Sequence, residues 1–392
     1  MAHKYLSRTL VVMTGILIIA ALSSCSWRAG GKDLDSNDAT VKPIEILWSV
    51  DVDGRKPADP LAYGHVALTA QGDDARVVIG GRDGRAHVYN LSGDEIHRVP
   101  LLEASDSGTV ILASGLAVLS DTNAQLYAID PQLGKVVWKF SLSSPVTGLP
   151  IRIEQDVLVQ CTDNRIYRIN ANGKKVWSFS AQAGGLGLYL NATPLLHENR
   201  IYALLSSGDA VALDAATGDL IWRKQLLLNT DAAHLADLKA PQAAPIWMDQ
   251  LTWDGSTAKD LVFFAFYQGD VFALSRADGS VLLTHTISLK SAHLVDAKHL
   301  YMADSHGNFQ AVDRSTGIIL WQEHLSDAEL VGPIMWQESL WLADSQGSIF
   351  RMDQEGHVQA SINLPGAIDR PPVATSRGVL LHTSLGGLYL VR

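Results

Sequence analysis

Cysteine is nearly absent from this sequence: the 392 residues contain two, Cys25 and Cys161. Two cysteines cannot form a framework of several disulfides, and they lack the close spacing of a zinc or redox motif. Cys161 ends an apolar run, Val157–Cys161, in which a thiol packs as a small hydrophobic side chain. The fold therefore has to be held by its hydrophobic core, which a hydrophobic content of 47% can supply.

Positive charge is also scarce. The chain has 31 Lys and Arg against 41 Asp and Glu, which gives a formal net charge of −10. Nucleic acids and anionic lipid surfaces attract proteins through an excess of basic residues. We therefore expect no nucleic acid partner and no electrostatic binding to anionic lipid.

Catalytic signatures are missing as well. The sequence has no G-x-S-x-G elbow, no H-E-x-x-H motif and no Walker loop. The glycine-rich stretch Gly184–Gly187 is not followed by a helical pattern, so it does not predict a phosphate site. His293, His299 and His306 are six and seven residues apart, wider than the usual spacing of metal ligands. We predict no catalytic residue, no metal site and no cofactor.

The first 25 residues differ from the rest of the chain. Lys4 and Arg8 precede an apolar stretch, Leu10–Leu22, that is too short to span a membrane as a helix. The tetrapeptide Leu-Ser-Ser-Cys that ends at Cys25 resembles the lipobox of bacterial lipoproteins. This resemblance implies cleavage before Cys25 and lipid attachment to it, which anchors a protein without a transmembrane helix. An ordinary signal peptide, or an uncleaved short anchor, is the alternative.

These observations divide the chain into a signal peptide (1–24), a lipidated cysteine with a flexible tether (25–43) and a folded body (44–392). The tether is polar and contains two adjacent glycines and three aspartates. Ser26 follows the cysteine, where an aspartate would favour the inner membrane in sorting of the enterobacterial type. The lipobox resemblance thus implies an outer-membrane lipoprotein whose body faces the periplasm.

The body contains an internal repeat of about 40 residues. Each copy has an alternating strand ending in Asp or Asn, a turn with glycine, and a strand with tryptophan four residues after the glycine. The clearest pairs are Gly134–Trp138, Gly173–Trp177, Gly218–Trp222 and Gly317–Trp321. Three weaker copies have His97, Leu283 and Ala360 in the position of tryptophan, and an eighth copy ends at Arg392. One step, between Asp214 and Ser275, is longer than the others.

Each copy predicts a four-stranded antiparallel sheet with polar turns between its strands. In the fourth copy we expect strands at 194–196, 201–205, 210–213 and 220–226. Prolines open several of the first strands, at Pro150, Pro194, Pro245, Pro333 and Pro372. Recurring acidic turns, which begin at Asp121, Asp163, Asp304 and Asp344, indicate hairpins and not a unique catalytic carboxylate.

A single sheet of this kind cannot cover both of its faces, whereas sheets stacked around an axis can. The repeat therefore predicts an all-β fold, an eight-bladed β-propeller of four-stranded antiparallel blades. The eighth copy lacks its outer strand, and Ile44–Val50, which contains Trp48, can supply it and close the last blade. Seven blades would follow if the weak first copy were miscounted. An outer-strand tryptophan is expected to pack between neighbouring blades.

Two segments are not explained by the repeat. The first, Ala181–Ala192, contains the sequence Gly-Leu-Gly-Leu-Tyr, and the second is Leu226–Gln242. Both are longer than a connection between strands requires, and extra loops on a scaffold are where binding concentrates. They can equally pack on each other over the central channel.

The order of features along this chain resembles that of the BamB family of lipoprotein propellers. These features are the lipobox, the tether, the eight repeats, the Gly-Leu-Gly-Leu segment and the long loop before Pro245. This resemblance implies a non-catalytic scaffold of the β-barrel assembly machinery, bound to BamA through its periplasmic POTRA domains and working with other Bam subunits. It implies partner contacts by Leu186, Leu188 and Tyr189 and, in the following loop, by Asp237 and Leu238. Tyr189 stands where the family has arginine, so we expect a mainly apolar contact. Binding of unfolded outer-membrane proteins by β-augmentation is a further suggestion.

Two other hypotheses compete with that of a scaffold for the β-barrel assembly machinery. The repeat also resembles the propeller of quinoprotein dehydrogenases, which predicts a periplasmic enzyme or ligand sensor. Those enzymes generally use adjacent cysteines and a calcium site, and this sequence has no cysteine pair. A scaffold for another envelope complex is the third reading.

Overall fold

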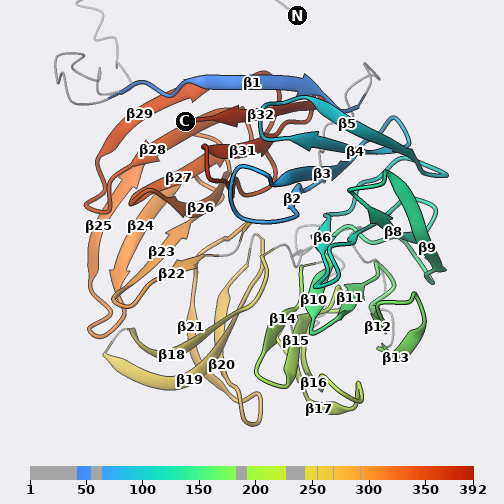
Figure 1. Cartoon of the computed structure of the whole chain (residues 1–392). Helices are drawn as coiled ribbons and strands as arrows, with labels where there is room; N and C mark the ends of the chain where they lie inside the picture. Colours follow the sequence, from blue (N-terminus) through green and yellow to red (C-terminus); the bar gives the residue numbers. More distant parts are fainter. Residues whose placement is uncertain are drawn as a thin grey trace, which may run out of the picture. The chain divides into compact units, whose positions relative to one another are not determined.

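The computed structural model describes residues 42–53, 64–181, 192–226 and 243–392, except 254, 268 and 292. The chain divides after residue 40, and every described residue belongs to the second unit, 41–392. The described part of the second unit consists of eight four-stranded sheets arranged as a β-propeller (Figure 1). Among the described residues, no helix is long and apolar enough to cross a membrane.

Each blade has, in spatial order, an inner strand, two middle strands and an outer strand. Blade 1 contains β2 (Ala67–Leu68), β3 (Arg76–Gly80), β4 (Arg85–Asn90) and β5 (Glu95–Pro100). Blade 2 contains β6 (Val110–Ile111), β7 (Ala117–Ser120), β8 (Gln125–Asp130) and β9 (Lys135–Ser141). Blade 3 contains β10 (Ile151–Ile153), β11 (Asp156–Gln160), β12 (Arg165–Ile169) and β13 (Lys175–Ser180). Blade 4 contains β14 (Leu195–His197), β15 (Arg200–Leu204), β16 (Asp209–Asp214) and β17 (Leu220–Gln225).

The remaining blades follow the same order. Blade 5 contains β18 (Ile246–Trp253), β19 (Ser256–Ala265), β20 (Val271–Ser275) and β21 (Val281–His285). Blade 6 contains β22 (Leu294–Val295), β23 (His299–Ala303), β24 (Asn308–Asp313) and β25 (Ile319–His324). Blade 7 contains β26 (Leu330–Trp336), β27 (Ser339–Asp344), β28 (Ser348–Met352) and β29 (Val358–Asn363). Blade 8 contains β30 (Val373–Ala374), β31 (Val379–His382), β32 (Gly387–Val391) and β1 (Ile46–Asp51).

The predicted eight-bladed fold is confirmed, and the weak first copy of the repeat is a complete blade. The four strands expected in the fourth copy correspond to β14–β17, and each end agrees within one residue. The second and third strands of each blade are mostly buried, whereas the side chains of the outer strands are mainly exposed or half-buried. This pattern arises because the inner parts of each blade are covered by neighbouring blades on both faces.

The N-terminal strand closes the ring, as expected. β1 pairs antiparallel with β32, with Trp48 opposite Leu390. The pairing continues beyond the strands, since the Glu45 and Arg392 backbones exchange two hydrogen bonds of 2.8 and 2.9 Å. The two ends of the body therefore share blade 8, and opening the ring requires breaking this ladder.

Tryptophans of the outer strands join neighbouring blades, but each contacts the glycine of the next copy and not the one in its own copy. A Cβ atom added to the glycine would lie 2.6–2.9 Å from the indole at five interfaces, so only glycine allows this approach. The five pairs are Trp48–Gly93, Trp138–Gly173, Trp177–Gly218, Trp222–Gly279 and Trp321–Gly356. In each pair the indole N–H also donates to a carbonyl of the same turn, at 2.8–3.2 Å.

His97 makes the same contact between blades 1 and 2. A Cβ added to Gly134 would lie 2.6 Å from its ring, and its Nε2 donates to the Gln132 carbonyl at 2.9 Å. The imidazole therefore substitutes for the indole in both packing and hydrogen bonding. We refer to this glycine–ring contact with its N–H bond as the blade latch.

Two blades have no ring in the latch position and contact the next blade through their inner hairpins. Blade 5 has Leu283, and there the backbone N–H of Thr252, on β18, donates to the Arg314 carbonyl of blade 6 at 2.9 Å. In blade 7, which has Ala360, the indole N–H of Trp336 on β26 donates to the Thr375 carbonyl of blade 8 at 2.7 Å. The latch position alone thus does not reveal whether two blades are joined.

The inner strands differ from the sequence prediction in two respects. Four of the five prolines immediately precede an inner strand, but Pro333 lies inside β26, where the pairing with β27 is irregular between Val331 and Ile334. The long step between blades 4 and 5 has two parts, because the β18–β19 hairpin, with strands of 8 and 10 residues, is extended in addition to the connection before it.

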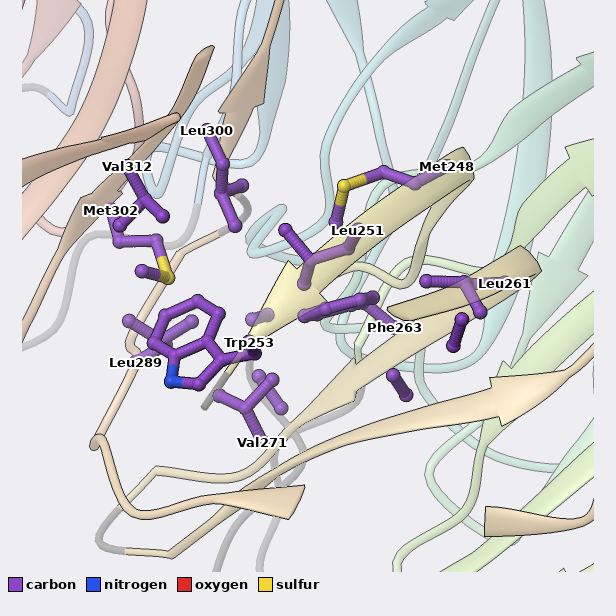
Figure 2. Close-up of a cluster of buried hydrophobic side chains, with 14 residues drawn as sticks. Met248, Leu251, Trp253, Leu261, Phe263, Val271, Leu289, Leu300, Met302 and Val312 are labelled. Atoms are coloured by element: carbon purple, nitrogen blue, oxygen red, sulfur yellow. The ribbon is translucent and has the colours of Figure 1, made fainter. Parts of the chain in front are cut away.

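The cores lie between adjacent blades. Figure 2 shows the cluster between blades 5 and 6, where Trp253 from the extended hairpin lies with Leu289 and Met302. Cys161 is buried and free, as predicted, within the core between blades 2 and 3. Burial raises the pKa of its thiol to about 12, so it remains protonated and packs as a hydrophobic group.

Candidate partner-binding face

Every site residue predicted from the sequence lies outside the described residues. This applies to Cys25 and to the predicted contact residues Leu186, Leu188, Tyr189, Asp237 and Leu238. Their assignments remain predictions. What the structure describes is where the two contact segments, 182–191 and 227–242, leave and rejoin the propeller.

Both contact segments connect an outer strand to the inner strand of the following blade. The first follows β13 and precedes β14, and the second follows β17 and precedes β18. Four antiparallel strands alternate in direction, so connections of this type begin and end at the same edge of every blade. We call the surface formed by these edges the connector face. The two segments are therefore attached to one face, on either side of blade 4.

The described ends of both segments are fixed in the core. Ala192 and Leu226 belong to the buried cluster around Trp222 and Phe264, and Ala243 belongs to the cluster between blades 5 and 6. The Leu226 N–H also donates to the Gly208 carbonyl at 3.0 Å. Rigid attachment points limit the region in which the two segments can meet a partner.

A largely buried lysine joins three other connectors. Lys290 Nζ lies 2.8 Å from Glu329 Oε2 and 2.7 Å from Asp369 Oδ1, which precede blades 7 and 8. Its side chain is 11% exposed and that of Asp369 is 5% exposed. Burial opposes ionisation of Glu329, but hydrogen bonds from Lys290 and Tyr267 hold the pKa of its carboxyl below the usual range. The two ion pairs join the connectors that precede blades 6, 7 and 8.

Further bonds extend around the connector face. The Arg370 guanidinium donates to the Thr147 carbonyl at 2.6 Å, which joins the connector before blade 8 to the one before blade 3. Arg82 pairs with Asp106 at 3.2 Å, and its backbone N–H donates to Asp53 at 2.8 Å. Burial, with Arg370 nearby, lowers the pKa of His65 to about 4, so this imidazole is neutral at pH 7. The described connectors form a preorganised surface.

The recurring aspartates close hairpins on this face, as predicted. Asp121, Asp304 and Asp344 each accept two backbone N–H groups, from the residues two and four positions later, at 2.8–3.0 Å. Asp163 is different, because Cys161 occupies the first turn position of its blade and Asp163 occupies the third. It accepts from Arg165 at 3.1 Å. These carboxylates accept hydrogen bonds from the backbone of their own turns.

The histidines do not form a metal site in the described part of the chain, where no cluster of three potential ligands occurs. His293 is buried against Phe263, with ring centroids 5.6 Å apart, while His299 pairs with Asp296 at 2.9 Å. Sequence reasoning did not identify the Lys290 cluster. Its three members come from different connectors and have no common spacing, so only the ring brings them together.

Comparison with known proteins agrees with this geometry. The family model of the outer membrane protein assembly factor BamB matches residues 45–323. The protein of that name from Bordetella pertussis is 27% identical over 98% of this chain and 97% of its own length. The crystal structure of BamB from Moraxella catarrhalis superposes with a TM-score of 0.71 at 19% identity, covering 89% of this chain and 99% of that one.

An enzyme shares the fold at lower sequence similarity. A quinohemoprotein alcohol dehydrogenase from Pseudomonas putida HK5 has a TM-score of 0.69 at 12% identity, covering 89% of this chain and 76% of its own. This likeness shows the propeller alone, whereas the family match extends over more than half of the chain in sequence. The chain therefore belongs to the family of the outer membrane protein assembly factor BamB, a family of non-catalytic assembly factors.

Proposed function

We propose that this chain is a lipid-anchored scaffold of the outer-membrane β-barrel assembly complex, which binds the periplasmic POTRA domains of BamA with its connector face. The observation that carries this proposal is the full-length relationship to outer membrane protein assembly factors. The lipid would be attached at Cys25, and the tether 25–43 would let the propeller reach its partner from the outer membrane.

The position of the two long connectors supports the choice of face. Both attach to the same face around blade 4, and their described ends are buried. Two loops held next to each other on a rigid support can contact one partner domain together, and preorganisation lowers the entropic cost of binding. The other connectors are fastened by Lys290 and Arg370, so binding would not have to order them.

Within these connectors we assign the contact to Leu186, Leu188 and Tyr189, with Asp237 and Leu238 in the second. Apolar and aromatic side chains at the centre of an interface contribute most of the binding energy, and charged pairs at its rim contribute little. The tyrosine at position 189 therefore favours an apolar contact over the salt bridge that an arginine would form.

Affinity for purified BamA POTRA domains tests this assignment. The variant Leu186→Ala with Leu188→Ala is expected to raise the Kd at least tenfold, since hot-spot residues cost about 2 kcal/mol or more on truncation. Leu133→Ala is the matched control, because Leu133 is an exposed leucine in the β8–β9 hairpin, at the opposite edge of its blade. An unchanged Kd in the double variant would contradict the assignment of the contact residues. No binding by the wild type would contradict BamA as the partner.

The anchor is tested separately in cells. Cys25→Ser is expected to remove the protein from the outer-membrane fraction, because no cysteine remains there to carry the lipid. Mass analysis of the N-terminal peptide of the wild type should show acylated Cys25 as its first residue. An unmodified peptide that includes residues before 25 would contradict the lipoprotein assignment.

A further inference from the structure

Blade 5 has a cavity beside Leu283, the residue in its latch position. The cavity has a volume of about 210 Å³ and is bordered by Leu251, Trp253, Phe263, Leu283, His285 and Met302. Leu283 occupies the latch position, and the tip of the β18–β19 hairpin provides the opposite wall through Trp253. The Trp253 and His285 rings, 4.3 Å apart, lie at its border.

The contact between blades 5 and 6 differs from those at the other interfaces. Five of the other interfaces place an indole, and a sixth an imidazole, against a glycine of the next blade. In blade 5 the backbone of Thr252 and Trp253 lies against Gly317 of blade 6, the place that a ring takes at those interfaces, and the cavity lies beside Leu283. Pockets for drug-sized ligands measure roughly 300–1,000 Å³, so a cavity of this size suits a single large side chain better than a cofactor.

The strand next to the cavity has an edge without charge. β21 has the sequence Val-Leu-Leu-Thr-His, whereas β5, β9, β17 and β25 each carry at least one Lys, Arg or Glu. Charged side chains on an edge strand prevent pairing with other chains. Val281 and Leu282 are 39% and 42% exposed, so the edge is apolar as well as uncharged.

The outer strand of blade 7 provides a contrast. β29 also lacks a charged residue, but its exposed side chains, Ser361 and Asn363, are polar. The neighbours of β21, by comparison, continue the apolar surface, with exposed Leu220 and Ile221 on β17 and Ile319 and Leu320 on β25. Blade 5 thus lies in the middle of an apolar section of the propeller rim.

We propose that the edge of β21 pairs with an extended segment of an unfolded outer-membrane β-barrel protein, one aromatic side chain of which enters the cavity beside Leu283. Such segments alternate apolar with polar residues over about ten positions and include aromatic residues. Their uncharged face matches the uncharged edge of β21, and backbone hydrogen bonds would supply affinity while the cavity selects the side chain. This inference rests on the proposed assembly function and names the class of client and its contact.

A peptide of defined composition tests the pairing. The probe is a fluorescein-labelled peptide of about ten residues that alternates threonine with valine and has phenylalanine at its centre, the length of a barrel strand. Its binding to the mature chain, residues 25–392 with Cys25→Ser so that no lipid is attached, is followed by fluorescence anisotropy. Replacement of the central phenylalanine by serine is expected to raise the Kd at least tenfold, because the serine leaves the cavity empty.

Two protein variants and a control locate the site. Leu283→Trp places an indole in the cavity, and Thr284→Lys places a charge on the β21 edge. Each should raise the Kd for the peptide at least tenfold. Ser361→Lys adds the same charge to an exposed position of β29 and should leave the Kd within twofold. Circular dichroism confirms that each variant is folded, and Thr284→Lys keeps the test valid if Leu283→Trp does not fold.

The outcomes separate this inference from the proposed function. No binding by the wild type, Kd values within twofold for Thr284→Lys, or an equal loss in Ser361→Lys would each overturn the β21 site. Thr284→Lys should still bind BamA POTRA domains with the wild-type Kd, because β21 is not part of the predicted contact segments. If the wild-type protein does not bind BamA, the proposed function is overturned but the peptide site is not.

Discussion

Replacing Trp222 by alanine removes the blade latch between blades 4 and 5 and should lower the free energy of unfolding by about 4 kcal/mol. The indole is 7% exposed and lies among aromatic neighbours, with ring centroids 6.0 Å from Tyr202 and 6.4 Å from Phe264. Its N–H donates to the Arg276 carbonyl at 3.1 Å. Truncation of a buried tryptophan to alanine typically costs about 3–5 kcal/mol, which includes the cavity left behind.

The partner glycine gives the prediction a sharper form. Gly279 has a φ of +72°, and a Cβ atom there would lie 2.7 Å from the Trp222 ring. Gly279→Ala should therefore cost about 1–2 kcal/mol for the left-handed backbone and a further 1–3 kcal/mol for the clash. When Trp222 is already alanine, the clash disappears and the backbone cost remains. The double variant should be about 1–3 kcal/mol more stable than the sum of the single effects predicts.

Equilibrium unfolding in guanidinium chloride, followed by far-UV circular dichroism, measures the four free energies of this cycle. Gly115→Ala is the matched control, because Gly115 also has a positive φ, of +84°, but an added Cβ there would meet no atom within 4 Å. It should show the backbone cost without coupling to Trp222→Ala. Additivity of Trp222→Ala and Gly279→Ala within about 0.5 kcal/mol would refute the latch as a packing contact.

Two further predictions concern pH and ring closure. Burial lowers the pKa of His293 to about 4, compared with about 6.5 in the unfolded chain. The unfolded state therefore binds a proton first, and the free energy of unfolding falls by at most about 3 kcal/mol as pH drops from above 6.5 to 4. His293→Leu should flatten the dependence of the melting temperature on pH between 7 and 4.5, and an unchanged slope would contradict this account. Trp48→Ala should cost about 2 kcal/mol, less than a fully buried indole, and speed proteolysis of the chain ends. Trp138→Ala, with a similar stability loss, should leave the ends protected; equal proteolysis of both variants would argue against ring closure by Trp48.

The blade latch illustrates what could be predicted from sequence and what could not. The Gly–Trp spacing of four residues revealed the repeat, because both residues belong to one turn and strand. Their contact, however, joins different copies: Trp138 packs on Gly173 and not on Gly134. His97 was recognised in the tryptophan position, but its hydrogen bond across the blade boundary follows only from the geometry of the ring.

Local patterns determined the number of blades, the closing strand around Trp48 and the burial of Cys161, because strand period, turn residues and repeat length depend on neighbours in the chain. Tertiary structure decided how Thr252 replaces a missing indole and how Lys290, Glu329 and Asp369 meet from three connectors. These contacts join residues of different copies, and their distances depend on closure of the ring. The cavity beside Leu283 has the same origin, since a leucine in the latch position leaves space only when the neighbouring blade and hairpin define its walls.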